Sequence, residues 1–425
     1  MKAHPPYIIT HLDLSVQQVP PALDLSENGI YLVFWWKEIA LGHIFLQPGT
    51  SLTSKEYYSK LVATIRPAVK FYSKGKEAAP SDWKQWRPNH NIAAWSAWMN
   101  NIFTSYIPEQ LPATVPVSVI ICTRHRADQL QRCLQLLVSL ECQPEQIIVV
   151  DNAPAPGDTS TFDVAQQFKG VTYVKESYIG LDIARNTGII YAKAPIIAYV
   201  DDDVVVHPSW LYRVWENFQD PAVAAMTGLV IASELNTEAQ YIFERHWSFN
   251  RGYKDKTYDS NYFNTTLAKG PPVWEIGAGA NMAFRKNIFE EVGYFNELLD
   301  VGAAGCNGDS EMWYRILAAG HIIKYNPRAV VFHEHRKEMK GLKKQIFYYM
   351  RGFITAALIQ QKQHRQAGYK RHIFRVLPGY YGQLIRKGFP NYRYRYSTLM
   401  AEMGGVLSGL SFYFRNRKHH PHAKR

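Results

Sequence analysis

Four short apolar segments between Val117 and Val200 constrain the fold of this 425-residue chain more than any other feature. The segments are Val117–Cys122, Gln146–Val150, Val171–Val174 and Ile196–Val200, with helical patterns at Gln129–Leu140 and Gly180–Ala192. Strands that are apolar throughout and alternate with helices are typical of a mostly parallel sheet with helices on both faces. We therefore predict an α/β domain over residues 111–335.

Two further parts flank this predicted domain. Residues 1–110 contain strand patterns at Ile30–Trp36 and His43–Leu46 and a tryptophan-rich helical pattern from Trp83 to Phe103. They predict a small N-terminal β-containing module, whose role the sequence does not indicate. Residues 336–425 predict a helical C-terminal segment, with an apolar stripe from Leu342 to Leu358.

The positive charge of the chain is concentrated in the C-terminal segment. The net charge is +12, yet residues 340–425 hold 18 lysines and arginines against a single acid, Glu402. A basic surface of this kind favours an anionic partner, and we expect a membrane surface rather than nucleic acid. A solvated basic face is the alternative. The extreme tail, Arg415 to Arg425, is expected to be disordered.

The N-terminus and the cysteines bear on localisation. The first residues lack the apolar core of a signal peptide, and no apolar run is long enough to span a bilayer. The four cysteines show no CxxC pattern, which argues against structural zinc and requires no disulfide. We expect a cytoplasmic protein that can lie peripherally on the cytoplasmic membrane face.

Polar residues gather where the predicted strands end. Thr123, Asp151 and the triplet Asp201–Asp203 each follow a buried strand. In parallel sheets, ligands bind beyond the carboxyl ends of the strands. Three consecutive carboxylates repel one another, and a hard cation such as Mg²⁺ or Mn²⁺ would neutralise them while keeping positions open for phosphate oxygens. An acidic solvated turn is the alternative.

Seven stretches in one order resemble glycosyltransferase family 2, whose members have the GT-A fold. The stretches are SVIICTRHR (118–126), IIVVDNA (147–153), GLDIARNTGI (180–189), IIAYVDDDVVV (196–206), GAGANMAFR (277–285), GDSEMWYRILAAG (308–320) and PRAVVFHEHR (327–336). The resemblance implies an inverting glycosyltransferase that uses a nucleotide-diphosphate sugar, UDP- or dTDP-linked, and a glycan or lipid-linked acceptor.

The resemblance also implies roles on the donor side. Thr123, Arg126 and Asp151 are similar to residues that contact the nucleotide, and Arg185 and Asn186 to residues facing the diphosphate and ribose. Within the triplet, Asp201 resembles the residue near the ribose, Asp203 the metal ligand, and Asp202 a less directly engaged neighbour. His333 matches a histidine that meets the metal or diphosphate in several relatives, with His335 as the alternative.

On the acceptor side, Asp309 is similar to the general base that deprotonates the acceptor hydroxyl, and Glu311 is the alternative. The family often has two adjacent acids at this point, whereas here Gly308 precedes Asp309. Gly279 and Asn281 belong to a stretch like the family's acceptor-side loop, and Trp274 could stack on a sugar.

Two other functions remain open from the sequence. A nucleotidyltransferase can share the sheet and an acidic metal site, and a non-catalytic protein could bind nucleotide or glycan on the same fold. A dehydrogenase is disfavoured, because the turn after the first strand, Thr123–Arg126, has no GxGxxG pattern.

Overall fold

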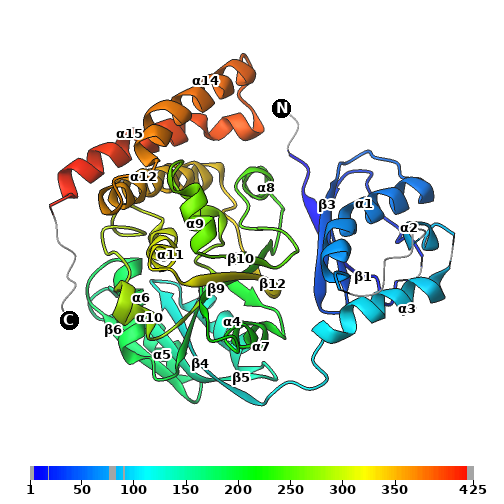
Figure 1. Ribbon diagram of the computed structural model, residues 1–425, viewed down its shortest axis with the longest axis horizontal. Coiled ribbons are helices and arrows are strands. Elements are labelled where there is room, and N and C mark those ends of the chain that lie inside the picture. Colours follow the sequence, from blue (N-terminus) through cyan, green and yellow to red (C-terminus); the bar gives the residue numbers. More distant parts are fainter. Residues whose placement is uncertain (1–3, 18, 76–82, 90, 419–425) are drawn as a thin grey trace.

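A computed structural model gives the arrangement of residues 4–17, 19–75, 83–89 and 91–418. Figure 1 shows a central domain with a smaller N-terminal module on one side and a layer of C-terminal helices across its top. The fold class predicted from the sequence is confirmed: a central sheet carries helices on both faces.

The N-terminal module pairs a small sheet with helices. Its three strands run in the order β1-β2-β3, with β1 parallel and β3 antiparallel to β2. The tryptophan-rich pattern forms two helices rather than one, because Pro88 lacks an amide hydrogen and Asn91 caps the second helix. The elements are β1 (Tyr7–Asp13), β2 (Gly29–Trp36), β3 (Ile39–Leu46), α1 (Ser54–Tyr72), α2 (Trp83–Trp86) and α3 (Ile92–Phe103).

The central sheet has nine strands in the order β10-β12-β9-β11-β7-β4-β5-β6, with β8 paired to β12. Strands β6, β5, β4 and β7 form a parallel half, and antiparallel β11 joins that half to β9 and β12. The strands are β4 (Thr114–Thr123), β5 (Gln143–Asn152), β6 (Val171–Glu176), β7 (Ile196–Val200), β8 (Val204–Val206), β9 (Val223–Ala232), β10 (Lys256–Tyr258), β11 (Asn281–Arg285) and β12 (Ile322–His333).

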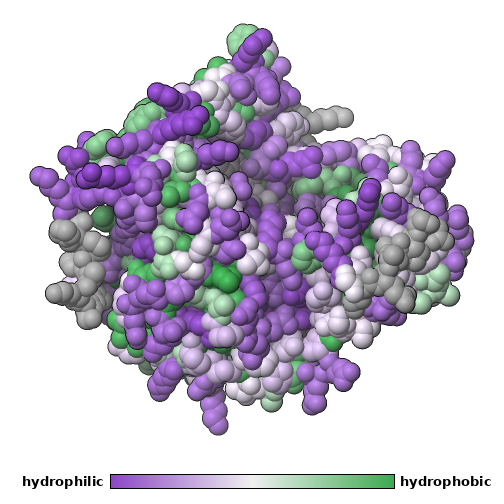
Figure 2. Space-filling model, in the orientation of Figure 1, coloured by the Kyte–Doolittle hydropathy of each residue, from purple (hydrophilic) through white to green (hydrophobic). Residues whose placement is uncertain are grey.

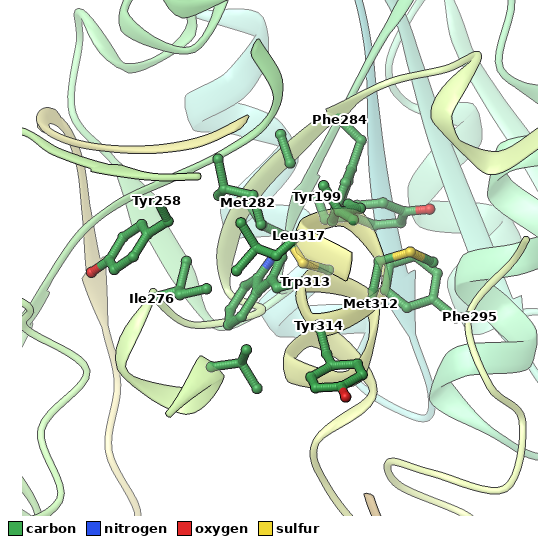
Figure 3. Close-up of a cluster of buried hydrophobic side chains, with 14 of the residues drawn as sticks. Tyr199, Tyr258, Ile276, Met282, Phe284, Phe295, Met312, Trp313, Tyr314 and Leu317 are labelled. Atoms are coloured by element: carbon green, nitrogen blue, oxygen red, sulfur yellow. The ribbon is translucent and has the colours of Figure 1, made fainter. Parts of the chain in front are cut away.

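Alternate residues of the central strands supply two separate cores. Ile120 and Ile148 face α6 and α11, whereas Val119 and Val149 face α4 and α7. Figure 3 shows the first core, where Trp313 of α11 lies beside Met282 and Tyr199 of the sheet. The helices are α4 (Ala127–Val138), α5 (Ser160–Gln166), α6 (Leu181–Tyr191), α7 (Trp210–Asn217), α8 (Glu238–His246), α9 (Ser260–Leu267), α10 (Ile288–Val292) and α11 (Gly308–Ala318).

The C-terminal segment is helical, and its apolar stripe is used within the protein. Leu342, Ile346 and Ile354 of α12 are fully buried, and α12 packs along α15. The stripe is therefore not free for another partner. Arg415 and Asn416 complete α15, so the tail expected to be disordered begins inside a helix, and residues 419–425 lie outside the described residues. The helices are α12 (Met339–Gln363), α13 (Tyr369–Arg371), α14 (Leu377–Gly388) and α15 (Leu399–Asn416).

Among the described residues, no helix combines the length and the apolar composition needed to cross a bilayer.

Candidate active site

The sheet gathers the predicted donor-side residues at one edge. Thr123 ends β4 and lies in register with Asp151 near the end of β5, while the aspartate triplet follows β7 directly. Parallel strands bring these carboxyl ends together, although the residues are about 80 positions apart in sequence at most.

Asp202 is the most constrained carboxylate of the triplet. Thr123 Oγ1 donates a hydrogen bond to Asp202 Oδ2 at 2.7 Å, and Arg126 Nη1 donates to Asp202 Oδ1 at 2.8 Å. The same Arg126 nitrogen reaches Asp203 Oδ2 at 3.0 Å. Both oxygens of Asp202 are thus occupied, whereas Asp203 keeps its Oδ1 without a hydrogen-bond partner among the described residues.

Asp201, Asp203 and His333 form a cluster suited to a metal ion. One ligand atom from each lies within 4.8 Å of the others, and His333 Nε2 is 3.6 Å from Asp203 Oδ1. The antiparallel pairing of β8 with β12 sets His333 opposite Val204, immediately after the triplet. Two carboxylates and one imidazole are a donor set that Mn²⁺ or Mg²⁺ accepts.

Burial shapes the protonation of this cluster. It lowers the pKa of His333 to about 4, so the imidazole is neutral near pH 7, as a metal ligand must be. Burial, reinforced by the charge of Asp203, raises the pKa of Asp201 to about 7. A cation placed among these groups would favour the ionised carboxylates, because it would offset their mutual repulsion.

Asp151 offers one oxygen at the edge of the sheet. Its Oδ2 accepts a hydrogen bond from the Tyr173 hydroxyl at 2.9 Å, and its Oδ1 is buried without a partner among the described residues. Burial raises the pKa of Asp151. Within the part of the chain that the structure describes, this oxygen therefore lacks the hydrogen bond that a buried carboxylate normally has.

The two predicted diphosphate-facing residues of α6 have different surroundings. Arg185 is buried, and its Nη1 donates to Asp182 Oδ1 at 2.9 Å and to Asp300 Oδ2 at 2.7 Å. Asn186 instead exchanges hydrogen bonds with the backbone of Phe295, through both its amide nitrogen and its amide oxygen. The structure therefore brings Asn186 to a supporting loop and not to the edge where the strands end.

Asp309 lies near the start of α11, beside Arg185 and Gly279. A Cβ atom on residue 279 would lie 2.8 Å from Arg185 Nη2 and 3.2 Å from Asp309 Oδ2, so only glycine leaves both groups undisturbed. Burial raises the pKa of Asp309, the charge of Asp300 adds to the rise, and Arg185 opposes it. A carboxylate whose pKa is raised in this way is suited to act as a general base.

Glu311 has a different environment. It is 1% exposed, and both of its oxygens accept from Arg315 Nε at 3.0 Å. Gln363 of α12 also donates to Oε1. Both oxygens of Glu311 are already hydrogen-bonded within the protein. Asp309 is therefore the better candidate for contact with a substrate.

Two predicted acceptor-side residues belong to the scaffold. Asn281 is fully buried in β11, where its amide donates to Leu229 O and Ala329 O and accepts from Trp210 Nε1. Trp274 is partly buried and packs edge-on against Phe353, with 4.9 Å between the ring centroids. Of the predicted acceptor-side residues, Gly279 is the one that the structure brings beside Asp309.

The sequence pattern did not reveal Asp182 and Asp300 as members of this site. Asp182 is one turn before Arg185 on α6. This spacing of three residues is the one local feature of the sequence that indicates the ion pair. Asp300 has a positive φ of 58° in the loop before α11, and its contact with Arg185 spans 115 residues. Together they hold the guanidinium of Arg185 in place beside Gly279 and near Asp309.

The chain is similar to known glycosyltransferases. Residues 118–293 match the family model described as glycosyl transferase family 2. The chain is 26% identical over 244 residues to the pre-mycofactocin glycosyltransferase of Mycobacterium tuberculosis, covering 57% of this chain and 47% of that protein. It is 28% identical over 244 residues to glycosyltransferase AglE of Haloferax volcanii, covering 55% and 72%. It is 25% identical over 315 residues to the succinoglycan biosynthesis protein ExoM of Rhizobium meliloti, covering 70% and 93%.

The resemblance to glycosyltransferase family 2 noted in the sequence is therefore confirmed over residues 118–293. It spans about half the length of the pre-mycofactocin glycosyltransferase, 47%. Among solved structures, the mannosyltransferase PcManGT from Pyrobaculum calidifontis, in complex with GDP-Man and Mn²⁺, is 16% identical with a TM-score of 0.48, over 75% of this chain and 94% of that one.

Proposed function

We propose that this protein is a metal-dependent inverting glycosyltransferase, which moves a sugar from a nucleotide-diphosphate sugar to a hydroxyl of a glycan or lipid-linked acceptor. One observation supports this most strongly. The negative charges of Asp201 in the metal cluster and of Asp309 both raise the pKa of the buried Arg185, so both halves of the candidate site lie near this one guanidinium. A donor diphosphate and an acceptor hydroxyl need this separation of a cationic site from a base.

The donor would lie along the edge where the strands end. Asp151 Oδ1 would accept from the nucleobase, and Thr123 and Arg126 would hold Asp202 and Asp203 in place below the diphosphate. Mg²⁺ or Mn²⁺ bound by Asp201, Asp203 and His333 would supply positive charge where the leaving diphosphate develops negative charge.

At the acceptor, Asp309 would take the proton of the attacking hydroxyl. A bond forms between the acceptor oxygen and the anomeric carbon while the bond from that carbon to the diphosphate oxygen breaks, and the diphosphate leaves with the electron pair. A single in-line displacement inverts the anomeric centre. Gly279 keeps the approach to Asp309 Oδ2 free of a side chain.

The experiment is a donor screen with the purified protein. UDP-, dTDP- and GDP-sugars are tested for a rise in melting temperature with and without Mn²⁺, since a ligand that binds only the folded state stabilises it. The stabilising donor is then followed for slow hydrolysis to nucleoside diphosphate. We expect hydrolysis to require Mn²⁺, to stop with EDTA, and to be absent in Asp203→Ala.

The same assay separates this proposal from the other two functions. Release of pyrophosphate from a sugar phosphate and a nucleoside triphosphate would indicate a nucleotidyltransferase. Donor binding without turnover, with acceptor glycans present, would indicate a binding protein. Full activity in EDTA would contradict metal dependence.

We also place an anionic membrane surface among the proposed partners. Ten of the 22 exposed large apolar side chains among the described residues lie between Phe374 and Phe414, a region that holds five arginines and lysines and one acid, Glu402. Phe389 is 75% exposed, Met400 72% and Leu407 69%. In Figure 2, apolar and hydrophilic atoms are intermixed along the upper part of the view, where α14 and α15 lie. Such a mixture suits the headgroup region of a bilayer.

A further inference from the structure

A buried row of polar side chains connects the candidate metal cluster to the N-terminal module. His333 Nδ1 is 3.2 Å from His335 Nδ1, and His335 Nε2 is 3.0 Å from Glu244 Oε2 on α8. The other carboxylate oxygen of Glu244, Oε1, accepts a hydrogen bond from the Tyr31 hydroxyl at 3.0 Å. Tyr31 lies on β2, so the row starts in one folded unit and ends in another.

We infer that Tyr31 is a positioning residue for the metal centre: through Glu244 and His335 it fixes the proton of His333 on Nδ1 and leaves Nε2 free to bind the metal. This inference rests on the proposed metal site. It assigns to the N-terminal module a role that its sequence did not indicate.

The donors and acceptors along the row determine which nitrogen of His333 carries the hydrogen. The two carboxylate oxygens of Glu244 accept one hydrogen bond from the Tyr31 hydroxyl and one from His335 Nε2–H. A neutral His335 with its hydrogen on Nε2 has only a lone pair on Nδ1. His333 Nδ1 must then donate to it, and the remaining lone pair of His333 lies on Nε2.

That lone pair has the direction a metal ligand requires. His333 Nε2 is the ring nitrogen near Asp203 Oδ1, at 3.6 Å. Partners that hold the second nitrogen of a metal-bound histidine fix its tautomer and orientation, and their loss weakens metal binding. The opposite tautomer would place a hydrogen on Nε2 and block the metal.

The surroundings protect the row from water. Tyr31 is fully buried, and Glu244 and His335 are 5% and 4% exposed. Phe243 packs on the His335 ring with 4.5 Å between centroids, and Phe249 packs edge-on against His333 at 5.5 Å. With solvent excluded, each polar atom in the row depends on its neighbour in the protein for a hydrogen bond.

The position of Tyr31 depends on how the module docks. Tyr31 and Trp35 of β2 share one apolar cluster with Leu229 and Ile231 of β9 and Val330 of β12. Because β12 continues from Val330 to His333, the docked face of β2 and the metal ligand are parts of one packed unit.

The test compares Mn²⁺ binding by the full chain and by matched variants, using calorimetry without donor. Tyr31→Phe removes one hydroxyl from the row. Tyr7→Phe is the control, because Tyr7 lies in the same apolar cluster but its hydroxyl bonds to Gln47 within the module. We expect about tenfold weaker Mn²⁺ binding for Tyr31→Phe, as for other partners of metal-bound histidines, and no change for Tyr7→Phe. Melting curves without metal check that both variants fold.

A second variant extends the binding test, and a second measurement does not depend on metal binding. His335→Phe keeps a ring against Phe243 but removes the acceptor for His333, so it should weaken Mn²⁺ binding further. In metal-free wild-type protein, nitrogen NMR of labelled histidines should find His333 with its hydrogen on Nδ1, and in His335→Phe a mixture of tautomers. Wild-type Mn²⁺ affinity in Tyr31→Phe, or His333 with its hydrogen on Nε2, would overturn the inference. Failure of wild-type protein to bind Mn²⁺ would instead refute the proposed metal site.

Discussion

The carboxylate of Asp182 fills the space beside Gly308 that a side chain would otherwise occupy. An ideal Cβ on residue 308 would lie 2.0 Å from Asp182 Oδ2 and 2.5 Å from its Cγ. The family resemblance predicts an acid at position 308, next to Asp309. Here a second carboxylate reaches the start of α11 from α6, and the glycine makes room for it.

We expect Gly308→Ala to destabilise the protein by about 1–3 kcal/mol, the usual cost of overpacking. The methyl group must displace Asp182, which Arg185 holds at 2.9 Å. Asp182→Ala should relieve most of this cost, so the two substitutions should be strongly non-additive. Urea unfolding of the two single variants and the double variant measures the coupling. Additive losses would show that the two positions do not compete for space.

Asp309→Asn and Glu311→Gln separate the two acids of α11. Asp309→Asn should keep donor binding and lose turnover by roughly two to four orders of magnitude, the usual effect of removing a general base. Glu311→Gln should instead lose about 1–3 kcal/mol of stability, because Arg315 would lose a charged partner. Turnover below the melting temperature should stay near that of the wild type. The reverse result, an active Asp309→Asn and an inactive folded Glu311→Gln, would move the base to Glu311.

The pKa of Asp201 predicts how metal-free stability varies with pH. Because burial raises this pKa from 3.8 to about 7, the folded protein binds the proton more tightly than the unfolded chain does. The contribution of Asp201 to stability is therefore complete below pH 3.8 and is lost as the pH rises through about 7. Asp201→Asn has no such loss, so we expect it to melt above the wild type at pH 8 and close to it at pH 4.

Asp158 is the control, because its pKa is shifted in the opposite direction from that of Asp201. Hydrogen bonds from Ser160 lower the pKa of Asp158, so its contribution is lost as the pH falls, and Asp158→Asn should be the less stable protein at pH 8. Added Mn²⁺ should reverse the order for Asp201→Asn, since only the wild type keeps both carboxylate ligands. Melting temperatures between pH 4 and 8, with and without Mn²⁺, test both statements. A constant difference between Asp201→Asn and wild type at all pH values would contradict the first.

Liposome co-sedimentation tests the proposed membrane surface. We expect binding to vesicles with anionic lipid, none to neutral vesicles, and weaker binding as salt screens the charges. Phe389→Ser with Leu407→Ser should reduce binding without loss of stability, because both side chains are exposed. Phe347→Ser, on the inner side of α12 near Gly404, should lower stability instead. Equal binding to neutral and anionic vesicles, or to neither, would leave these residues as a solvated face.

Local patterns in the sequence predicted the parallel half of the sheet well. Ile196–Val200 forms a strand with the expected bounds, because a wholly apolar run ends at a charged triplet. The pattern was less informative where a residue serves distant backbone. Asn186 and Asn281 have side chains typical of ligand contacts, yet their amides bond to Phe295 and Ala329. The residues that neighbour either asparagine in the sequence do not indicate these distant backbone partners.

The metal cluster shows the same limit. The triplet and His333 could be associated through family motifs, and β8 and β12 do bring them together. Glu244 and Tyr31 could not be found this way, because Tyr31 and Glu244 are 213 residues apart and belong to no shared motif. The apolar stripe of α12 was visible in the sequence, but whether it faced a lipid or another helix depended on α15.

The docking of β2 against β12 has a consequence for synthesis on the ribosome. The module can fold as soon as its own residues emerge, but Val330 and His333 follow Tyr31 by about 300 residues, or roughly 15–60 s of translation. Until β9 and then β12 have been synthesised, the apolar face of Tyr31, Val33 and Trp35 lacks its partners from the central domain. A shielding chaperone, or a translation rate that shortens the delay, would matter most for this face, and substitutions there should reduce the yield of folded protein before they affect its activity.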